Sequence, residues 1–214
     1  MAPLPSNCRL VQHPLISHKM AQLRDVTTPP ERFRRVMRDL SRLMAYEMTR
    51  ELRTKPTQIR TPLEEISLPT LDETVCLVSI MRAGNGMLDG FLDMIPMACV
   101  GHVGIYRDKF IDNTVEYYFK LPSNSKGMRV LLLDPMLATG GTAISAIDRL
   151  KEYGVGMITQ ACLLTSPEGL AAMAEAHPDV QVVTMSVDRQ LNEKGYIVPG
   201  LGDAGDRLYG TPHD

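Results

Sequence analysis

The turn with the clearest chemical content lies between an apolar stretch ending at Asp134 and a helical pattern starting near Thr142. At such a junction free N–H groups and the positive end of a helix dipole point outward, and Thr139 and Thr142 add hydroxyl donors. Gly140 and Gly141 let backbone amides approach an anion without a Cβ in the way. The turn therefore predicts a phosphate site in which Asp134 holds sugar hydroxyls.

Other phosphate motifs do not describe this turn. It lacks the Lys-Ser/Thr pair of a Walker A loop and the G-x-G-x-x-G of a dinucleotide site, so a nucleoside monophosphate-like group fits better than a triphosphate. A bare T-G-G-T is equally well explained as a capped strand-to-helix turn. The preceding Asp134 and the loops described next favour phosphate.

Two further loops bring cationic side chains. Residues 79–86, S-I-M-R-A-G-N-G, follow another apolar run, and Arg82 has the planar fork that binds phosphate oxygens in pairs. Arg107, in Tyr-Arg-Asp-Lys at 106–109, opens an irregular stretch that resembles a flap able to close over a bound polyphosphate. A solvated charged hairpin is an almost equally good interpretation of that stretch.

The last loop, residues 195–206, is too rich in glycine for a helix and too irregular for a strand. Such a loop presents backbone donors and acceptors to a flat ligand. The histidines at 13, 18, 102, 177 and 213 form no metal or acid–base cluster, and none is assigned to catalysis.

Regular elements must position these loops. From about residue 74, short apolar β-branched runs alternate with helical stretches, which is typical of a parallel sheet with crossover helices. The predicted strands are VCLVSIM, ACVGHVGIY, RVLLLD, MITQACLLT and VQVVTMSVD, and TVEYYFKL is a further strand-like run within an excursion over the sheet. Helices are predicted near 87–95, 142–153 and 167–177, the last capped by Ser166.

An N-terminal helix is predicted after residues 28–31, T-P-P-E, which match a capping box. Its apolar stripe, from Phe33 to Met48 at helical spacing, is predicted to pack on the core or on a second subunit. The expected class is α/β, with a Rossmann-like parallel sheet flanked by helices.

Composition narrows the class of protein. The chain has 214 residues, 44% of them hydrophobic, which suits one domain. Its net charge of −2 gives no basic field for nucleic acid. The four cysteines have no zinc spacing and are expected to be reduced thiols of a cytoplasmic protein. Neither a signal peptide nor a membrane span is expected.

Together, H-P-L at 13–15, M-R-A-G-N-G-M, I-Y-R, D-P-M-L-A-T-G-G-T and G-Y-I-V-P-G-L-G-D-A-G-D resemble the uracil phosphoribosyltransferase family, from about His13 to Thr211. The resemblance implies the type I phosphoribosyltransferase fold, with a flexible β-excursion and a C-terminal base-binding loop. It implies a pentosyltransferase, EC 2.4.2.9, which converts uracil and phosphoribosyl pyrophosphate (PRPP) to UMP and diphosphate in pyrimidine salvage.

The resemblance also assigns residues. Catalytic roles fall to Asp134, Arg107 and Asp203, and uracil binding to Ile197, Gly202, Asp203 and Ala204. The implied PRPP-binding residues are Arg82, Ala83, Gly84, Arg107, Asp134, Pro135, Met136, Leu137, Ala138, Thr139, Gly140, Gly141, Thr142 and Asp203. Mg²⁺ is the implied cofactor, held mainly through PRPP with no dedicated protein ligand. A non-proline cis peptide beside Arg82 is also implied, and Asn85 stands where many relatives are expected to carry an apolar residue.

The expected organisation is a single domain over residues 1–214, with an N-terminal helical arm at 1–60, a core at 74–190 and a uracil-binding segment at 191–214. The expected partners are small molecules and a second copy in a homodimer or higher homo-oligomer, without nucleic acid or membrane. GTP as an allosteric activator and the choice between dimer and tetramer are left open by the sequence.

Three alternatives compete with this interpretation. The first is another enzyme of the same fold that acts on orotate or a purine; the carboxylate of orotate would call for a cation in the base loop, and residues 195–206 contain none. A nucleotide-sensing RNA-binding regulator would need a basic stripe or tail. A catalytically inactive oligomerisation subunit would not need the full set of phosphate and base segments.

Overall fold

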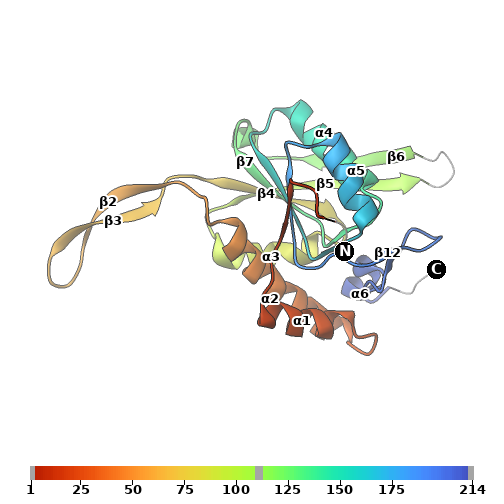
Figure 1. The fold of residues 1–214 in the computed structure, drawn as a ribbon. Helices are drawn as coiled ribbons and strands as arrows, with labels where there is room; N and C mark the ends of the chain where they lie inside the picture. Colours follow the sequence, from red (N-terminus) through yellow and green to blue (C-terminus); the bar gives the residue numbers. More distant parts are fainter. Residues whose placement is uncertain (1–2, 109–112, 212–214) are drawn as a thin grey trace.

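A seven-stranded sheet forms the centre of the computed structural model, which describes residues 3–108 and 113–211 (Figure 1). Its strand order is β1-β11-β9-β7-β4-β5-β6, and every pairing except that of β5 with β6 is parallel. The strands are β1 (Cys8–Leu10), β4 (Val75–Met81), β5 (Cys99–Asp108), β6 (Asn113–Lys120), β7 (Arg129–Leu133), β9 (Ile158–Cys162) and β11 (Gln181–Thr184). The expected α/β class is confirmed.

Alternation along the strands divides the core into two layers. In β4, Val75 and Leu77 join one apolar cluster while Cys76 and Val78 join the other, because successive side chains point to opposite faces of a sheet. Helices α1 (Pro14–Arg24), α2 (Pro30–Met48) and α3 (Asn85–Met94) cover one face. Helices α4 (Gly141–Tyr153) and α5 (Pro167–Ala176) cover the other.

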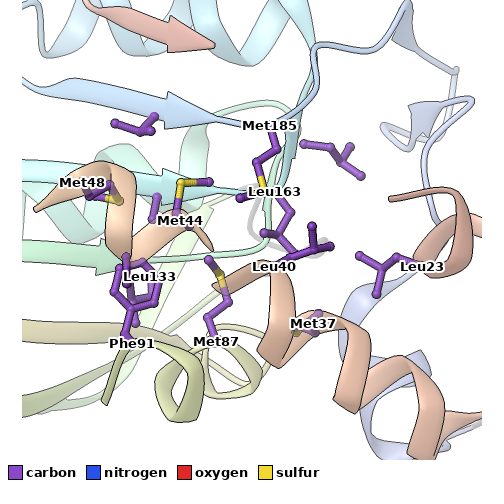
Figure 2. Packing of buried hydrophobic residues seen from close by; sticks show 14 of the residues in the cluster. Leu23, Met37, Leu40, Met44, Met48, Met87, Phe91, Leu133, Leu163 and Met185 are labelled. Atoms are coloured by element: carbon purple, nitrogen blue, oxygen red, sulfur yellow. The ribbon is translucent and has the colours of Figure 1, made fainter. Parts of the chain in front are cut away.

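The predicted apolar stripe of α2 packs inside the chain. Met37, Leu40 and Met44 are fully buried, and Figure 2 shows their side chains near Met87 of α3 and Leu133 of β7. The stripe therefore belongs to this chain's own core, which was one of the two roles expected of it.

The start of α2 differs from the prediction. Pro29 is the N-cap residue and makes no side-chain capping bond, while Thr28 Oγ1 donates a hydrogen bond to Gln22 O at 2.7 Å. The T-P-P-E pattern was misread because the carbonyl at the end of α1 offers the Thr28 hydroxyl a tertiary partner.

The first 60 residues are also less helical than expected. β1 joins the edge of the main sheet beside β11, and β2 (Thr54–Arg60) pairs with β3 (Glu65–Leu71) in a two-stranded hairpin that projects from the body (Figure 1). That hairpin was not predicted, because its alternating side chains are mostly exposed and give little apolar signal.

Two other segments are ordered differently from the expectation. β6 lies in the plane of the main sheet as its edge strand, antiparallel to β5, instead of passing over it. Within the C-terminal loop, Ile197–Val198 forms β13 against β12 (Gln190–Leu191), and Ala204–Tyr209 forms α6. Two-residue strands β8 (Met136–Leu137) and β10 (Leu164–Thr165) pair beside the main sheet, and a 3-10 turn, η1 (Ser123–Ser125), precedes β7.

The predicted cap of α5 is confirmed, and it also contacts the predicted phosphate loop, residues 134–142. Ser166 is fully buried, and its Oγ accepts a hydrogen bond from Gly169 N at 2.8 Å while donating one to Ala138 O at 2.6 Å. We expect Ser166→Ala to lower the free energy of unfolding by about 1–2 kcal/mol, because both bonds are lost in a buried site. Urea denaturation measures this, with the exposed Ser123→Ala as control; an unchanged midpoint would contradict the role.

Candidate active site

A cavity of about 290 Å³ opens at the carboxyl ends of β4 and β7. Its lining comes from four segments of the sequence: the end of β4, Ile105 of β5, the loop from β7 to α4, and the start of α6. The lining residues are Ile80, Met81, Arg82, Ala83, Ile105, Asp134, Pro135, Met136, Leu137, Ala138, Thr139, Gly140, Thr142, Ala143, Asp203, Ala204 and Gly205. The parallel topology brings these loops together, because parallel strands present their carboxyl ends at one edge.

The phosphate loop has the backbone shape that its glycines predict. Gly140 adopts φ +88° at the N-cap of α4 and has no side chain with which to cap the helix. The first amides of α4 are therefore available to an anion, and the helix dipole favours negative charge there. Thr139 and Thr142 line the cavity beside them, as expected.

Asp134 lies at the end of β7, on the cavity wall. It is half-buried, and burial raises the pKa of its carboxyl to about 7 despite the opposing hydrogen bond from the Met136 backbone. A carboxylate that is costly to ionise is well suited to gain from hydrogen-bond donors, such as sugar hydroxyls, or from a nearby cation.

Arg82 enters the cavity from the short loop between β4 and α3. The Met81–Arg82 peptide bond is cis, as the resemblance implied. Arg82 Nη2 lies 3.3 Å from Asp206 Oδ1, the guanidinium lies 5.8 Å from the centre of the Tyr209 ring, and Tyr209 Oη donates to Arg82 O at 3.2 Å. Its side chain is 57% exposed, so the cation remains accessible to a ligand.

Gly84 packs this loop against the strands. A Cβ at Gly84 would contact Leu133 O and would lie 2.6 Å from Ile80 O and 2.8 Å from Ile80 N, all of them backbone atoms. We expect Gly84→Ala to displace the loop and to lower kcat/KM for PRPP at least about tenfold, with about 1–3 kcal/mol of lost stability.

The control for this prediction is Gly127→Ala, which introduces a residue at φ +73° into open space. It is expected to cost about 1 kcal/mol of stability without a change in PRPP kinetics. Steady-state kinetics beside thermal denaturation distinguish the two variants, and equal kinetic losses in both would contradict a local effect of Gly84.

The C-terminal wall is anchored by contacts of two partly buried arginines that the sequence did not reveal. Arg24 of α1 forms a two-point ion pair with Asp188 and donates to Gly200 O at 2.7 Å, while Gly200 N donates to Asp188 at 2.8 Å. Arg207 of α6 donates to Leu23 O at 2.7 Å. These contacts hold residues 197–207 against α1. Sequence gave no signal for them, because the pairs are separated by more than 160 residues.

Asp203 has a structural role beside its predicted one. It is the N-cap of α6, and its Oδ1 accepts a hydrogen bond from Asp206 N at 2.9 Å. The residue also lines the cavity, next to Ala204 and Gly205. Its carboxylate therefore fixes the start of α6 at the cavity wall.

Most of the predicted site residues meet in this cavity. Arg82, Ala83, Asp134 to Gly140, Thr142, Asp203 and Ala204 line it. Gly84, Gly141, Ile197 and Gly202 are outside the lining; Ile197 is buried in β13 and Gly202 is exposed with φ +81°. Arg107 has its backbone in β5, but its side chain and residues 109–112 lie outside what the structure describes.

The lining also contains residues that were not predicted. Ile80, Met81, Ile105 and Ala143 contribute an apolar wall, and Gly205 contributes backbone. Their only signal in the sequence is that they stand at the ends of predicted strands or in the first turn of a helix.

Residues 3–108 and 113–211 contain no group of three His, Cys, Asp or Glu side chains placed to hold a metal ion. Over the same residues, none of the helices is both long and apolar enough to cross a membrane. All four cysteines are free thiols, as expected.

The sheet order, the phosphate loop at its carboxyl edge and the adjoining cationic loop define a type I phosphoribosyltransferase fold. An adenine phosphoribosyltransferase from Thermoanaerobacter pseudethanolicus shares the fold, with a TM-score of 0.50, 12% identity and coverage of 76% of this chain and 86% of that one. A family model described as uracil phosphoribosyltransferase matches residues 10–211. The chain belongs to the uracil phosphoribosyltransferase family.

Individual relatives agree with this assignment. Uracil phosphoribosyltransferase of Polaromonas naphthalenivorans is 51% identical over 207 residues, which cover 96% of this chain and 99% of the relative. That of Mesorhizobium japonicum is 51% identical over 203 residues, covering 94% and 97%. The structure of protein AQ2163 from Aquifex aeolicus matches with a TM-score of 0.91 and 36% identity, over 97% of this chain and 100% of that one.

Proposed function

We propose that this protein transfers the phosphoribosyl group of PRPP to uracil, giving UMP and diphosphate (EC 2.4.2.9), and so serves pyrimidine salvage in the cytoplasm. The observation that carries the proposal is the single cavity into which the phosphate loop, Arg82 and the C-terminal loop all open. Membership of the family supports the choice of uracil as the base.

The phosphate loop is assigned the ribose 5-phosphate end of PRPP. Residues 137–142 surround the start of α4, where free amides, two threonine hydroxyls and the helix dipole favour an anion. Asp134, which precedes this segment by three residues, is assigned the ribose hydroxyls. Its half-buried carboxylate accepts hydrogen bonds that strengthen in a water-poor site.

Arg82 is assigned the diphosphate end, together with Arg107 by resemblance. In the displacement, the bond from C1 of the ribose to the diphosphate oxygen breaks, its electron pair leaves on the diphosphate, and N1 of uracil bonds to C1 as its proton is released to water. Charge builds on the leaving group, so a cation held beside it lowers the barrier. The positive charge on the sugar resembles the oxocarbenium character of glycoside chemistry.

Mg²⁺ is the proposed cofactor, bound mainly through PRPP oxygens. When bound, it neutralises charge on the diphosphate and aids its departure. The donor set supports this form of binding, because Asp134 and Asp203 are the carboxylates that line the cavity and three-carboxylate clusters are missing from the described residues.

The C-terminal loop is assigned the base, through Ile197, Gly202, Asp203 and Ala204. Uracil presents an acceptor, a donor and an acceptor along one edge, which backbone groups of a glycine-rich loop satisfy without a dedicated side chain. A site that hydrogen-bonds a ligand edge rejects mismatched analogues by up to about 10⁴–10⁵, so cytosine is expected to be a poor substrate. Thymine exclusion must come from steric overlap with its methyl group.

Self-association is the proposed quaternary state, as a homodimer or higher homo-oligomer. The β2–β3 hairpin projects from the body and exposes Leu63, Leu68 and Leu71, at 95%, 42% and 45%. An arm of this shape has few contacts within its own chain, so a second copy is its proposed partner. Light scattering on the purified protein measures the state, and added GTP tests whether that nucleotide activates or reorganises it.

The test of function is UMP formation from purified protein, Mg²⁺ and PRPP with uracil, cytosine, orotate or hypoxanthine in turn. We expect UMP from uracil and no nucleotide from the other bases. A nucleotide from orotate or hypoxanthine would reassign the base. No product from any base, with tight UMP binding retained, would favour a nucleotide-sensing regulator.

A further inference from the structure

A chain of three polar side chains lies beneath the start of α3, in a layer otherwise packed with apolar groups. Ser79 is fully buried in β4, and its Oγ donates a hydrogen bond to Asn85 Oδ1 at 2.7 Å. The same Oγ lies 2.8 Å from His102 Nδ1 in β5. Because the hydroxyl has one proton and gives it to Asn85, His102 must donate, which places a proton on Nδ1.

Strands β4 and β5 set the position of this hydrogen-bonded chain of side chains. Ser79 and His102 are register partners in the parallel β4–β5 pair, so their side chains leave the same face of the sheet side by side. Val75 and Leu77 precede Ser79 on that face and belong to the apolar core. A serine there adds nothing to apolar packing, and burying it without hydrogen bonds would cost free energy.

Asn85 connects these hydrogen-bonded side chains to the candidate active site. It is the first residue of α3 and directly follows Arg82, Ala83 and Gly84. Its backbone N–H donates to Arg82 O at 3.2 Å, and Gly84 N donates to Ile80 O at 2.8 Å. Fixing the Asn85 side chain therefore fixes the end of the loop that carries Arg82. The polar residue at 85, where the family resemblance led us to expect an apolar one, is matched by the Ser79 hydroxyl.

We propose that Ser79, Asn85 and His102 are positioning residues that hold the 82–84 loop in the geometry that binds the diphosphate of PRPP, an inference that rests on the proposed function. None of the three needs to touch the substrate. Their effect is preorganisation, because a loop already held in its bound shape loses less freedom when the ligand arrives.

The test measures PRPP affinity by calorimetry and the kinetic constants for both substrates in Ser79→Ala, Asn85→Ala and the double variant. We expect either single change to raise Kd and KM for PRPP about tenfold, with KM for uracil and kcat within about twofold. We expect the double variant to bind PRPP no more weakly than the more impaired of the two single variants, because both changes break the same set of hydrogen bonds.

Ser125→Ala is the matched control. Ser125 is also fully buried and donates a hydrogen bond to Pro122 O at 2.6 Å, but it lies in η1, at the far end of β7 from Asp134. It should lose stability without losing PRPP affinity. Asn85 is only half-buried, so its variant is expected to fold even if Ser79→Ala does not.

The outcomes separate this inference from the proposed function. Unchanged PRPP affinity in Asn85→Ala, or an equal loss in Ser125→Ala, would overturn the positioning role while UMP formation by the unaltered protein still stood. PRPP binding that Asn85→Ala weakens, in a protein that makes no UMP, would support the network and reject the function. An unaltered protein that does not bind PRPP would overturn both.

Discussion

Replacing Asp134 with Asn is expected to lower kcat/KM for PRPP by about 10² to 10³, which corresponds to about 3–4 kcal/mol. The carboxylate lies on the cavity wall at the end of β7, where it faces the proposed ribose site. Asn keeps the shape but exchanges one acceptor oxygen for a donor and removes the negative charge. Steady-state kinetics with varied PRPP measure the loss, and near-normal turnover would remove Asp134 from the site.

The same substitution is expected to make the folded protein more stable at neutral pH. Burial raises the pKa of Asp134 to about 7, above its ordinary value of 3.8. Between these two values the folded chain binds more protons at this group than the unfolded chain, so stability falls as the pH rises from about 4 to about 7. A shift of this size is worth up to ~4 kcal/mol, and the partial exposure of Asp134 to pocket solvent reduces it to ~1–3 kcal/mol.

Denaturation midpoints at pH 5 and pH 8 check this expectation. The advantage of Asp134→Asn should be larger at pH 8, since the asparagine has no charge to bury. Glu152→Gln, on an exposed carboxylate of α4 whose partner is Arg149, is the control and should alter neither activity nor the pH dependence. A variant less stable than the parent at pH 8 would show that protein groups already satisfy the carboxylate, and would contradict the expectation.

Replacing Arg82 with Ala is the second change with a large expected effect, a loss of about 10² to 10³ in kcat/KM for PRPP. The side chain stands in the cavity, 57% exposed, with Asp206 at 3.3 Å as its ion-pair partner. A cation that meets the leaving diphosphate stabilises charge that develops only during the reaction, so kcat should fall as well as affinity. Arg82→Lys should recover part of the loss, because lysine supplies the charge without the planar fork.

Stability distinguishes this role from a structural one. An ion pair as exposed as that of Arg82 with Asp206 contributes at most about 1 kcal/mol, so the denaturation midpoint should change little. Arg50→Ala, at an exposed arginine paired with Glu47 on α2, is the control and should leave the kinetics unchanged. A large loss of stability in Arg82→Ala with intact kinetics would reassign Arg82 to the fold.

Local sequence was a good guide wherever one residue's neighbours along the chain decide its environment. The strand run VCLVSIM became β4 with the predicted ends, and Ser166 capped α5 as expected. The strand-to-helix loop after Asp134 was predictable for the same reason, since a strand end, two glycines and a helix start are all consecutive. Thr28 was misassigned because a carbonyl of a neighbouring helix gave its hydroxyl a different partner.

By itself the sequence therefore determined the α/β alternation, the strand-to-helix loop after Asp134 and the resemblance to a family, all of which depend on contiguous residues. The tertiary structure alone decided that β1 closes the sheet beside β11, that Arg24 and Arg207 anchor the base loop, and that Ser79 meets His102 and Asn85. Apart from Ser79 and Asn85, which are six residues apart, those contacts join residues distant along the chain. Their partners are selected by the register of strands and the packing of helices, which no local pattern specifies.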